Sequence, residues 1–219
     1  MINVNGERGG VRWVLVGPVV GTALAVVDSA VNHVPVWLGE VGTARAERGV
    51  WSQAAEFASL ILDAGWAWAA AAVLVGWLVS RNARPASAIL RGAVAGSLAL
   101  AFATAVYYAA DLLSDGGGWW GVATEYWLIA SVVLGPGLGI AGALIRRRGV
   151  VGTIAALLVP AIAALQMVLL PPDSESLMAL PVRLTVWIAA AAASVWVVSG
   201  RAADRAGLSS LPGQPNGSR

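Results

Sequence analysis

Cysteine and lysine are both absent from this 219-residue sequence, and histidine occurs only once. A chain without cysteine forms no disulfide, has no thiolate nucleophile and holds no iron–sulfur cluster through its own sulfur atoms. A single histidine argues against a zinc site of the usual kind, and no HExxH, GxSxG or DDxxD motif is present. The sequence also has no GxxxxGK loop and no GxGxxG that follows a predicted strand. We therefore predict neither a metal nor any other cofactor.

Charged residues are scarce as well. They make up 12% of the chain, against about 25% in a typical soluble domain. Hydrophobic residues make up 58% of the chain, and its mean hydropathy is +0.74. The sequence pI near 9.7 would suit a nucleic-acid partner, but the net charge is only +2 and the arginines are spread along the chain. We conclude that the chain binds no nucleic acid and is an integral membrane protein that lies in a lipid bilayer.

Six apolar segments are each long enough to cross about 30 Å of hydrocarbon as a helix. We expect an all-α fold, with a single polytopic transmembrane bundle over residues 1–200 and a disordered cytoplasmic tail over 201–219. Proline or Gly-Pro is expected to kink or break three of the spans, at Pro18, Pro136 and Pro160. The expected spans are Arg12–Val34, Ala54–Val79, Ile89–Leu113, the segment from Glu125 to the residues before Arg146, Val150–Leu170 and Leu177–Ser199.

The arginines are distributed unevenly between the two sides that six spans define. Eleven of them lie on the side of both termini, and only Arg45, Arg48 and Arg183 lie on the other side. Loops on the cytoplasmic side of a membrane carry the excess of positive charge. We therefore predict that both termini are cytoplasmic and that the protein is a multi-pass protein of the bacterial inner membrane.

The second expected span carries two carboxylates within the segment Glu56–Trp68, EFASLILDAGWAW. Glu56 and Asp63 are seven residues apart, which places them about 20° from each other around a helix. An ionised carboxylate that faces hydrocarbon is costly, so such residues usually face the interior of a bundle and mark a functional site. Trp66 lies on the flank of the same stripe, one turn further into the span.

The predicted topology places nearly all polar and aromatic side chains of the spans in their outer halves, whereas small residues that suit close helix packing fill the inner halves. We therefore expect a cavity in the outer half of the bundle, surrounded by the second, third and fourth spans. Its candidate catalytic residues are Asp63, Asp111, Glu125 and Glu56, and its candidate substrate-binding residues are Trp66, Tyr107, Tyr108, Tyr126, Trp127 and Asp28.

Some of these residues also have a purely structural explanation. Glu56 and Glu125 lie about a turn from the ends of their spans, where a carboxylate can reach the lipid headgroups. Asp28 and Arg183 are both in outer halves and can form an intramembrane ion pair. The two other acidic candidates point more strongly to function, because an aspartate side chain is too short to reach far toward the interface.

The expected cavity suits the acid-initiated cyclisation of a prenyl chain. A carboxylic acid in a site of low dielectric constant keeps its proton and can donate it to an alkene or epoxide. The faces of tryptophan and tyrosine rings attract the resulting carbocation by about 0.5–2 kcal/mol each. Exclusion of water from the chamber protects the cation. Asp63 is the first choice for the proton donor, because it lies deepest in its span. Trp66 is the first choice for the ring that faces the cation.

In its size, its several spans and its buried Glu56, Asp63, Asp111 and Glu125 among tryptophan and tyrosine, the chain resembles small integral-membrane terpene cyclases of actinobacterial meroterpenoid pathways. The drimentine type, which acts on prenylated indole diketopiperazines, is the most similar. The resemblance covers about residues 12–199 and rests on overall character rather than on a diagnostic motif. It implies a hydrophobic small-molecule substrate that carries a prenylated aromatic group, with no metal ion.

Two other functions remain open at this stage. Helices broken by proline around carboxylates are typical of secondary transporters, which makes a small proton-coupled transporter the main alternative. Against it, we find no internal repeat and all of the carboxylates on one side of the midplane. A non-catalytic membrane scaffold is the third possibility, in which the buried aspartates would serve only packing. The sequence defines neither the substrate nor the oligomeric state.

Overall fold

The computed structural model describes residues 12–115 and 121–209, and every regular element in these two ranges is a helix. A 3-10 turn, η1 (Arg12–Leu15), leads into α1 (Val16–Trp37), and a second one, η2 (Arg45–Glu47), precedes α2 (Val50–Leu62). The remaining helices are α3 (Gly65–Ser80), α4 (Pro85–Asp115), α5 (Val122–Leu144), α6 (Val150–Leu169) and α7 (Ala179–Ser209). The predicted all-α fold is confirmed.

Five of these helices are each long and apolar enough to cross a membrane. The pair α2 and α3 passes the same test only as a unit, bends by 60° at a short break, and is called the broken span below. The chain is therefore a multi-pass membrane protein with five candidate spans, or six if this pair crosses the membrane as one span. The side of the membrane on which the termini lie stays a prediction.

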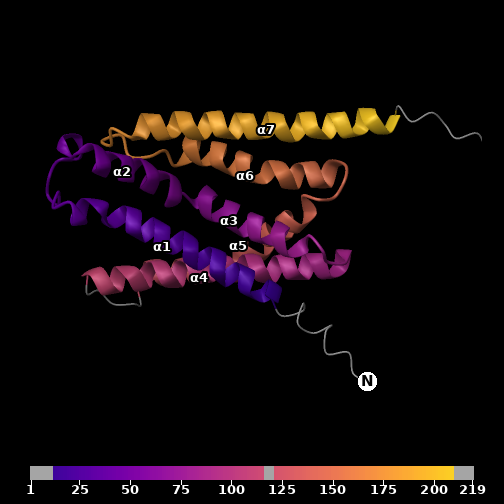
Figure 1. Cartoon of the computed structure of the whole chain (residues 1–219), viewed down its shortest axis with the longest axis horizontal. Helices are drawn as coiled ribbons and strands as arrows, with labels where there is room; N and C mark the ends of the chain where they lie inside the picture. Colours follow the sequence, from indigo (N-terminus) through magenta and orange to yellow (C-terminus); the bar gives the residue numbers. More distant parts are fainter. Residues whose placement is uncertain (1–11, 116–120, 210–219) are drawn as a thin grey trace, which may run out of the picture.

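The helices run roughly along one common axis, and the two ends of the helical chain, η1 and the end of α7, lie at the same end of the bundle (Figure 1). Helices α1, α3, α4 and α5 form the tightly packed part of the bundle, while α6 and α7 pack mainly on each other. Helix α7 also touches α2, so the broken span lies between the two parts.

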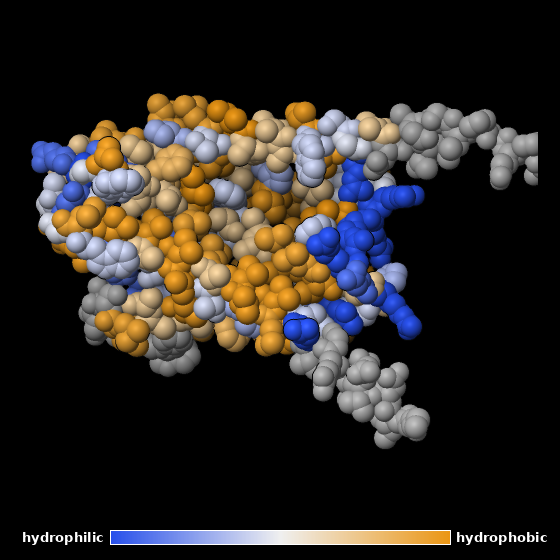
Figure 2. All heavy atoms as spheres, in the orientation of Figure 1, coloured by the Kyte–Doolittle hydropathy of each residue, from blue (hydrophilic) through white to orange (hydrophobic). Residues whose placement is uncertain are grey.

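Hydrophilic atoms gather at the end of the bundle where α3 meets α4 and α5 meets α6, and apolar surface covers much of the body between the two ends (Figure 2). Arginines at this end bind the free carbonyl groups of helix ends, as cations near helix C-termini commonly do. Arg146 donates to the carbonyl of Arg81, and Arg201 donates to the carbonyls of Arg147 and Ile145. At the opposite end, Arg45 contacts Glu56 at 3.8 Å and Asp173 at 3.6 Å.

Glycines allow α3, α4 and α5 to approach each other to backbone contact. A Cβ atom added at Gly139 of α5 would lie 1.9 Å from the carbonyl oxygen of Gly92 in α4. One added at Gly142 would lie 2.0 Å from the carbonyl oxygen of Val73 in α3. Small residues at helix–helix interfaces are the usual means of close packing in membranes, where no hydrophobic effect drives helices together.

The helix breaks expected at proline are not formed. Helices α5 and α6 continue through Pro136 and Pro160, and Pro18 lies in the first turn of α1, where a missing N–H costs least. The observed break falls instead between α2 and α3, where the chain has no proline. Helix α7 continues to Ser209, so residues 201–209 of the expected disordered tail are helical. Residues 210–219 lie outside the described ranges.

The predicted orientation can be tested by placing single cysteines at the two ends of the bundle, since the chain has none of its own. Asn82→Cys lies in the turn between α3 and α4, and Ala46→Cys lies in η2 at the opposite end; both positions are exposed. We expect an impermeant thiol reagent to label Ala46→Cys in intact cells and to label Asn82→Cys only after permeabilisation. The reverse pattern would show that the orientation is inverted.

The glycine contacts predict different effects for two substitutions on the same helix. Gly139→Ala forces a methyl group against the backbone of α4, whereas nothing lies within 4 Å of a Cβ atom at Gly137. We expect Gly139→Ala to lower the free energy of unfolding by about 1–3 kcal/mol, the usual cost of overpacking. Gly137→Ala is the matched control and should leave stability unchanged or raise it by up to about 1 kcal/mol. Thermal unfolding in detergent measures both, and equal losses would contradict the close contact.

Candidate functional site

The break in the second span is held open by side chains that bind the backbone groups it frees. Asp63 ends α2 with its N–H on the carbonyl of Ser59, and the extended residue Ala64 turns the chain into α3. The carbonyl of Leu62 accepts a hydrogen bond from the indole N–H of Trp68 at 2.9 Å. The N–H of Trp66 donates to the side-chain oxygen of Gln166, on α6, at 3.0 Å. Irregular backbone at membrane depth requires such internal partners, because lipid supplies none.

At this break the carboxyl group of Asp63 accepts hydrogen bonds from two polar side chains. Asn32 of α1 donates from Nδ2 to both carboxyl oxygens, at 3.4 and 3.2 Å, and the hydroxyl of Ser59 donates to Oδ2 at 3.0 Å. The same Asn32 nitrogen donates to the hydroxyl of Tyr107 on α4 at 3.1 Å. Asn32 therefore links the acid of the broken span to the aromatic wall formed by α4.

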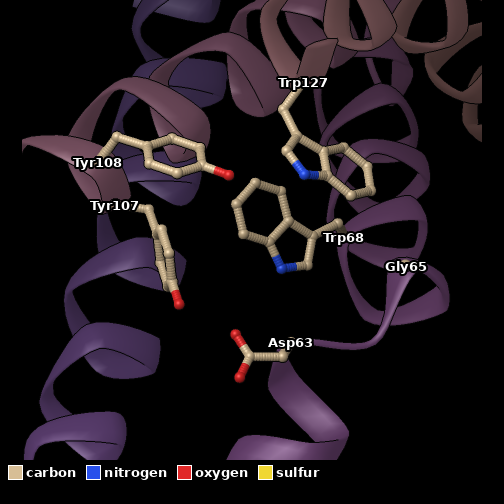
Figure 3. Close-up of a pocket in the computed structure, with 6 residues that line it drawn as sticks. All are labelled: Asp63, Gly65, Trp68, Tyr107, Tyr108 and Trp127. Carbon is tan, nitrogen blue, oxygen red and sulfur yellow. The ribbon is translucent and has the colours of Figure 1, made fainter. Parts of the chain in front are cut away.

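Asp63 lines a cavity whose other walls are mostly aromatic. The lining residues are Asp63, Gly65, Trp68, Tyr107, Tyr108 and Trp127. The carboxyl group lies beneath the rings of Tyr107 and Trp68, with Tyr108 and Trp127 on the far side of the space (Figure 3).

The four rings pack against one another in a continuous wall. Trp68 meets Tyr107 edge to face with ring centroids 6.1 Å apart, and its centroid is 6.3 Å from that of Trp127. Tyr107 and Tyr108 meet edge to face at 5.5 Å. The wall comes from α3, α4 and α5, and because Asp63 itself is exposed, the cavity is open on one side. Its volume is about 140 Å³.

Two further aspartates lie near this cavity. Asp28 of α1 is fully buried beside the carboxyl group of Asp63 and the indole of Trp68. Asp111 of α4 is partly buried and lies within electrostatic range of Asp28 and of both tyrosines. Among the described residues, the only ion pairs are those of Arg45 with Glu56 and Asp173, so no described cation pairs with Asp28 or Asp63. The site therefore gathers three acidic groups from α1, the break and α4.

The structure brings together only part of the residue set predicted from the sequence. Asp63, Tyr107, Tyr108 and Trp127 line the cavity, and Asp28 and Asp111 lie close to it. The sequence places Asp63 deepest in its span, but in the structure Asp28 is the buried carboxyl group of the site and Asp63 is exposed.

Four predicted residues lie elsewhere. Glu56 lies near Arg45 at the end of the bundle, and Glu125 and Tyr126 are exposed on the first turn of α5. Trp66 packs into a buried apolar cluster with residues of α6 and α7.

The alternative ion pair between Asp28 and Arg183 is not formed. Arg183 is exposed on α7, and no ion pair involving either residue occurs in the described ranges. The explanation lies in the packing, since α7 contacts α6 and α2 rather than α1. Shared depth along the membrane normal, which the sequence gives, does not say which helices are neighbours.

The sequence prediction missed Trp68 and the polar links through Asn32 and Ser59. On an uninterrupted helix, Trp68 would lie about 140° from Asp63 and Trp66 only about 60° away, because successive residues turn by about 100°. The 60° bend reverses that assignment. The sequence DAG at the break, which combines a helix-capping residue with a glycine, is the one signal that could have indicated it.

Comparisons of this chain with protein-family models, with curated proteins and with solved structures found no match. Among the described residues, no group of three or more histidine, cysteine, aspartate or glutamate side chains is arranged to hold a metal ion. The site must therefore be interpreted from its own geometry.

Proposed function

We propose that this protein is a membrane-bound terpene cyclase that protonates the prenyl chain of a prenylated aromatic substrate and guides the carbocation that results. The observation that supports this best is the cavity itself, where one carboxyl group and four aromatic rings face a common space. A ring face attracts a cation that lies within about 6 Å of its centroid. No cation is among the residues that line the cavity, so the lining itself carries no positive charge that would repel a cationic intermediate.

The reaction needs no co-reactant. The O–H bond of the Asp63 carboxyl group breaks as its proton adds to the terminal alkene or epoxide, and the alkene electron pairs then close the ring. Loss of a proton from the final carbocation forms a new double bond and returns the proton to a carboxylate. Tyr107, Tyr108, Trp68 and Trp127 stabilise the intermediate charge, and the apolar surroundings limit its capture by water.

The size of the cavity restricts how such a substrate is held. Its volume of about 140 Å³ is close to the roughly 150 Å³ of an apolar cavity that accommodates benzene. The reacting end of a prenyl chain fits this space, whereas the aromatic part of the substrate must extend through the open side. The bilayer is then the route by which a hydrophobic substrate of the drimentine-cyclase type arrives.

A second candidate function is proton-coupled transport, and it is favoured by the break between α2 and α3. Secondary transporters use discontinuous helices to build ion sites near the middle of the membrane. Here the break carries Asp63, with Asp28 and Asp111 nearby. In that case the acidic cluster would carry protons for a solute and would change no covalent bond.

The two proposals are tested with Asp63→Asn, which keeps the shape of the side chain but removes the acidic proton. We expect the variant to fold and to lose turnover of a prenylated aromatic substrate by a factor of about 10² or more, the usual scale for a lost general acid. Product formation by membranes that contain the protein is the measurement. Glu125→Gln is the matched control, because Glu125 is exposed and does not line the cavity.

Wild-type turnover in Asp63→Asn would contradict the role of Asp63 as the proton donor. If wild-type membranes form no product but reconstituted protein takes up protons with a solute, and Asp63→Asn abolishes this uptake, the transporter proposal replaces the cyclase.

The aromatic wall predicts a graded series at Trp68. Trp68→Phe keeps a ring face but removes the indole N–H that binds the carbonyl of Leu62, so it should change product ratios and lower thermal stability modestly. Trp68→Ala should lower turnover as well, because the cation then loses about 0.5–2 kcal/mol of ring attraction. Trp196→Phe, at an exposed position of α7, is the control and should behave as the wild type. Equal product ratios in all three variants would show that Trp68 does not face the reacting carbons.

A further inference from the structure

Among the acidic residues whose side chains the structure describes, Asp28 is the only one that is completely buried. Its exposed fraction is 0%, and neither of its carboxyl oxygens has a hydrogen-bond partner among the described residues. The nearby indole N–H of Trp68 already donates to the carbonyl of Leu62. An ionised carboxylate without a donor or a counter-charge is strongly disfavoured in such a place. Asp28 therefore needs a proton of its own or one that it shares.

The neighbour of Asp28 is in the opposite situation. Asp63 lines the cavity and is exposed, and its carboxyl group accepts hydrogen bonds from Asn32 and Ser59. These donors stabilise its ionised form. Two ionised carboxylates are both acceptors and cannot bind each other, whereas one proton between them supplies the missing donor. Like charges at short distance likewise prevent both groups from ionising together.

We propose that Asp28 and Asp63 share a single proton, and that Asp28 is the buried store from which the cavity-lining Asp63 receives it. The groups that face Asp28 from the helices packed around it are Asp63, Trp68 and, on α4, Asp111 and Tyr107. None of them carries a positive charge, so nothing in this set favours a doubly ionised pair.

The role of the pair in turnover rests on the cyclase proposal, whereas the shared proton itself does not. In turnover, the proton moves from Asp28 to Asp63 and then to the alkene carbon, so both carboxylates are ionised while the substrate carries its positive charge. The doubled negative charge attracts the cation. Loss of a proton from the final cation restores the singly protonated pair, and no other reactant is consumed. Asp28 does not line the cavity and acts only through Asp63, as a positioning residue.

The shared proton is tested by infrared spectroscopy on the full-length protein in lipid nanodiscs, with no substrate present. We expect the wild type at neutral pH to show the carbonyl stretch of a protonated carboxyl group, shifted in deuterated water. Asp28→Asn should lose this band, because its amide can donate to Asp63 without holding a titratable proton. Asp173→Asn, which changes an exposed carboxylate at the end of the bundle, should keep it. A wild-type protein without the band, or Asp28→Asn that retains it, would overturn the proposal.

Thermal unfolding across a pH series gives a second readout that a purely structural role would not produce. If the folded pair holds a proton that both aspartates release on unfolding, the folded state binds more protons, and its stability falls as pH rises. The melting temperature of the wild type should therefore fall more than that of Asp28→Asn between mildly acidic and alkaline pH. Parallel curves would refute the shared proton.

The outcomes separate this proposal from the cyclase proposal. Absence of the infrared band in the wild type contradicts the shared proton even if Asp28→Asn does not fold. If Asp63→Asn loses turnover but the wild type shows no band, the cyclase proposal stands and the shared proton is contradicted. If the wild type shows the band but forms no product, the shared proton stands and the cyclase proposal is contradicted.

Discussion

The arrangement of the site depends on the requirement that backbone polar groups inside a membrane have partners within the protein. A span that breaks at Asp63 and Ala64 frees carbonyl and N–H groups, and Trp68 and Gln166 bind two of them. These bonds fix the bend, and the bend sets where Asp63 points. Trp68 thus has two roles, since the same ring that closes the break forms one wall of the cavity. The break therefore builds the site rather than interrupting it.

The cavity also depends on a change in side-chain size along α3, α4 and α5. Where α3, α4 and α5 touch, glycines such as Gly92, Gly139 and Gly142 let backbones meet. Further along α4 and α5, Tyr107 and Trp127 both line the cavity, and each ring lies beside that of Trp68 on α3. Small residues therefore lie at the closest helix contacts, and large aromatic residues line the cavity. Packing rather than loop structure therefore determines the place of the cavity.

The sequence predicted the features that depend on composition and on one helix at a time. Long apolar segments predicted the helices that can cross a membrane, and helical spacing placed Tyr107, Tyr108 and Asp111 together on α4. It failed where the outcome depends on two helices. The bend places Trp68 rather than Trp66 at the cavity, and α7 packs on α6 and α2, so the pair of Asp28 with Arg183 is not formed in the described ranges. Helix order around a bundle is set by tertiary packing, which hydropathy does not encode.

The glycine contacts also bear on the choice between the two proposed functions. A transporter must expose its site to both sides of the membrane in turn, and so must open a path beyond the cavity. Beyond this cavity lie the backbone contacts of α3, α4 and α5 and a buried cluster that includes Val75, Val79 and Ala99. Such contacts are closely packed and resist gradual deformation.

A cyclase needs no such path. Its hydrophobic substrate and product can enter and leave through the open side of the same cavity, while the packed end stays closed and excludes water from the cation. The acidic groups are likewise gathered at this one open chamber rather than placed along a route across the bundle. The fixed glycine contacts therefore favour chemistry on a substrate held at one end over its passage through the protein.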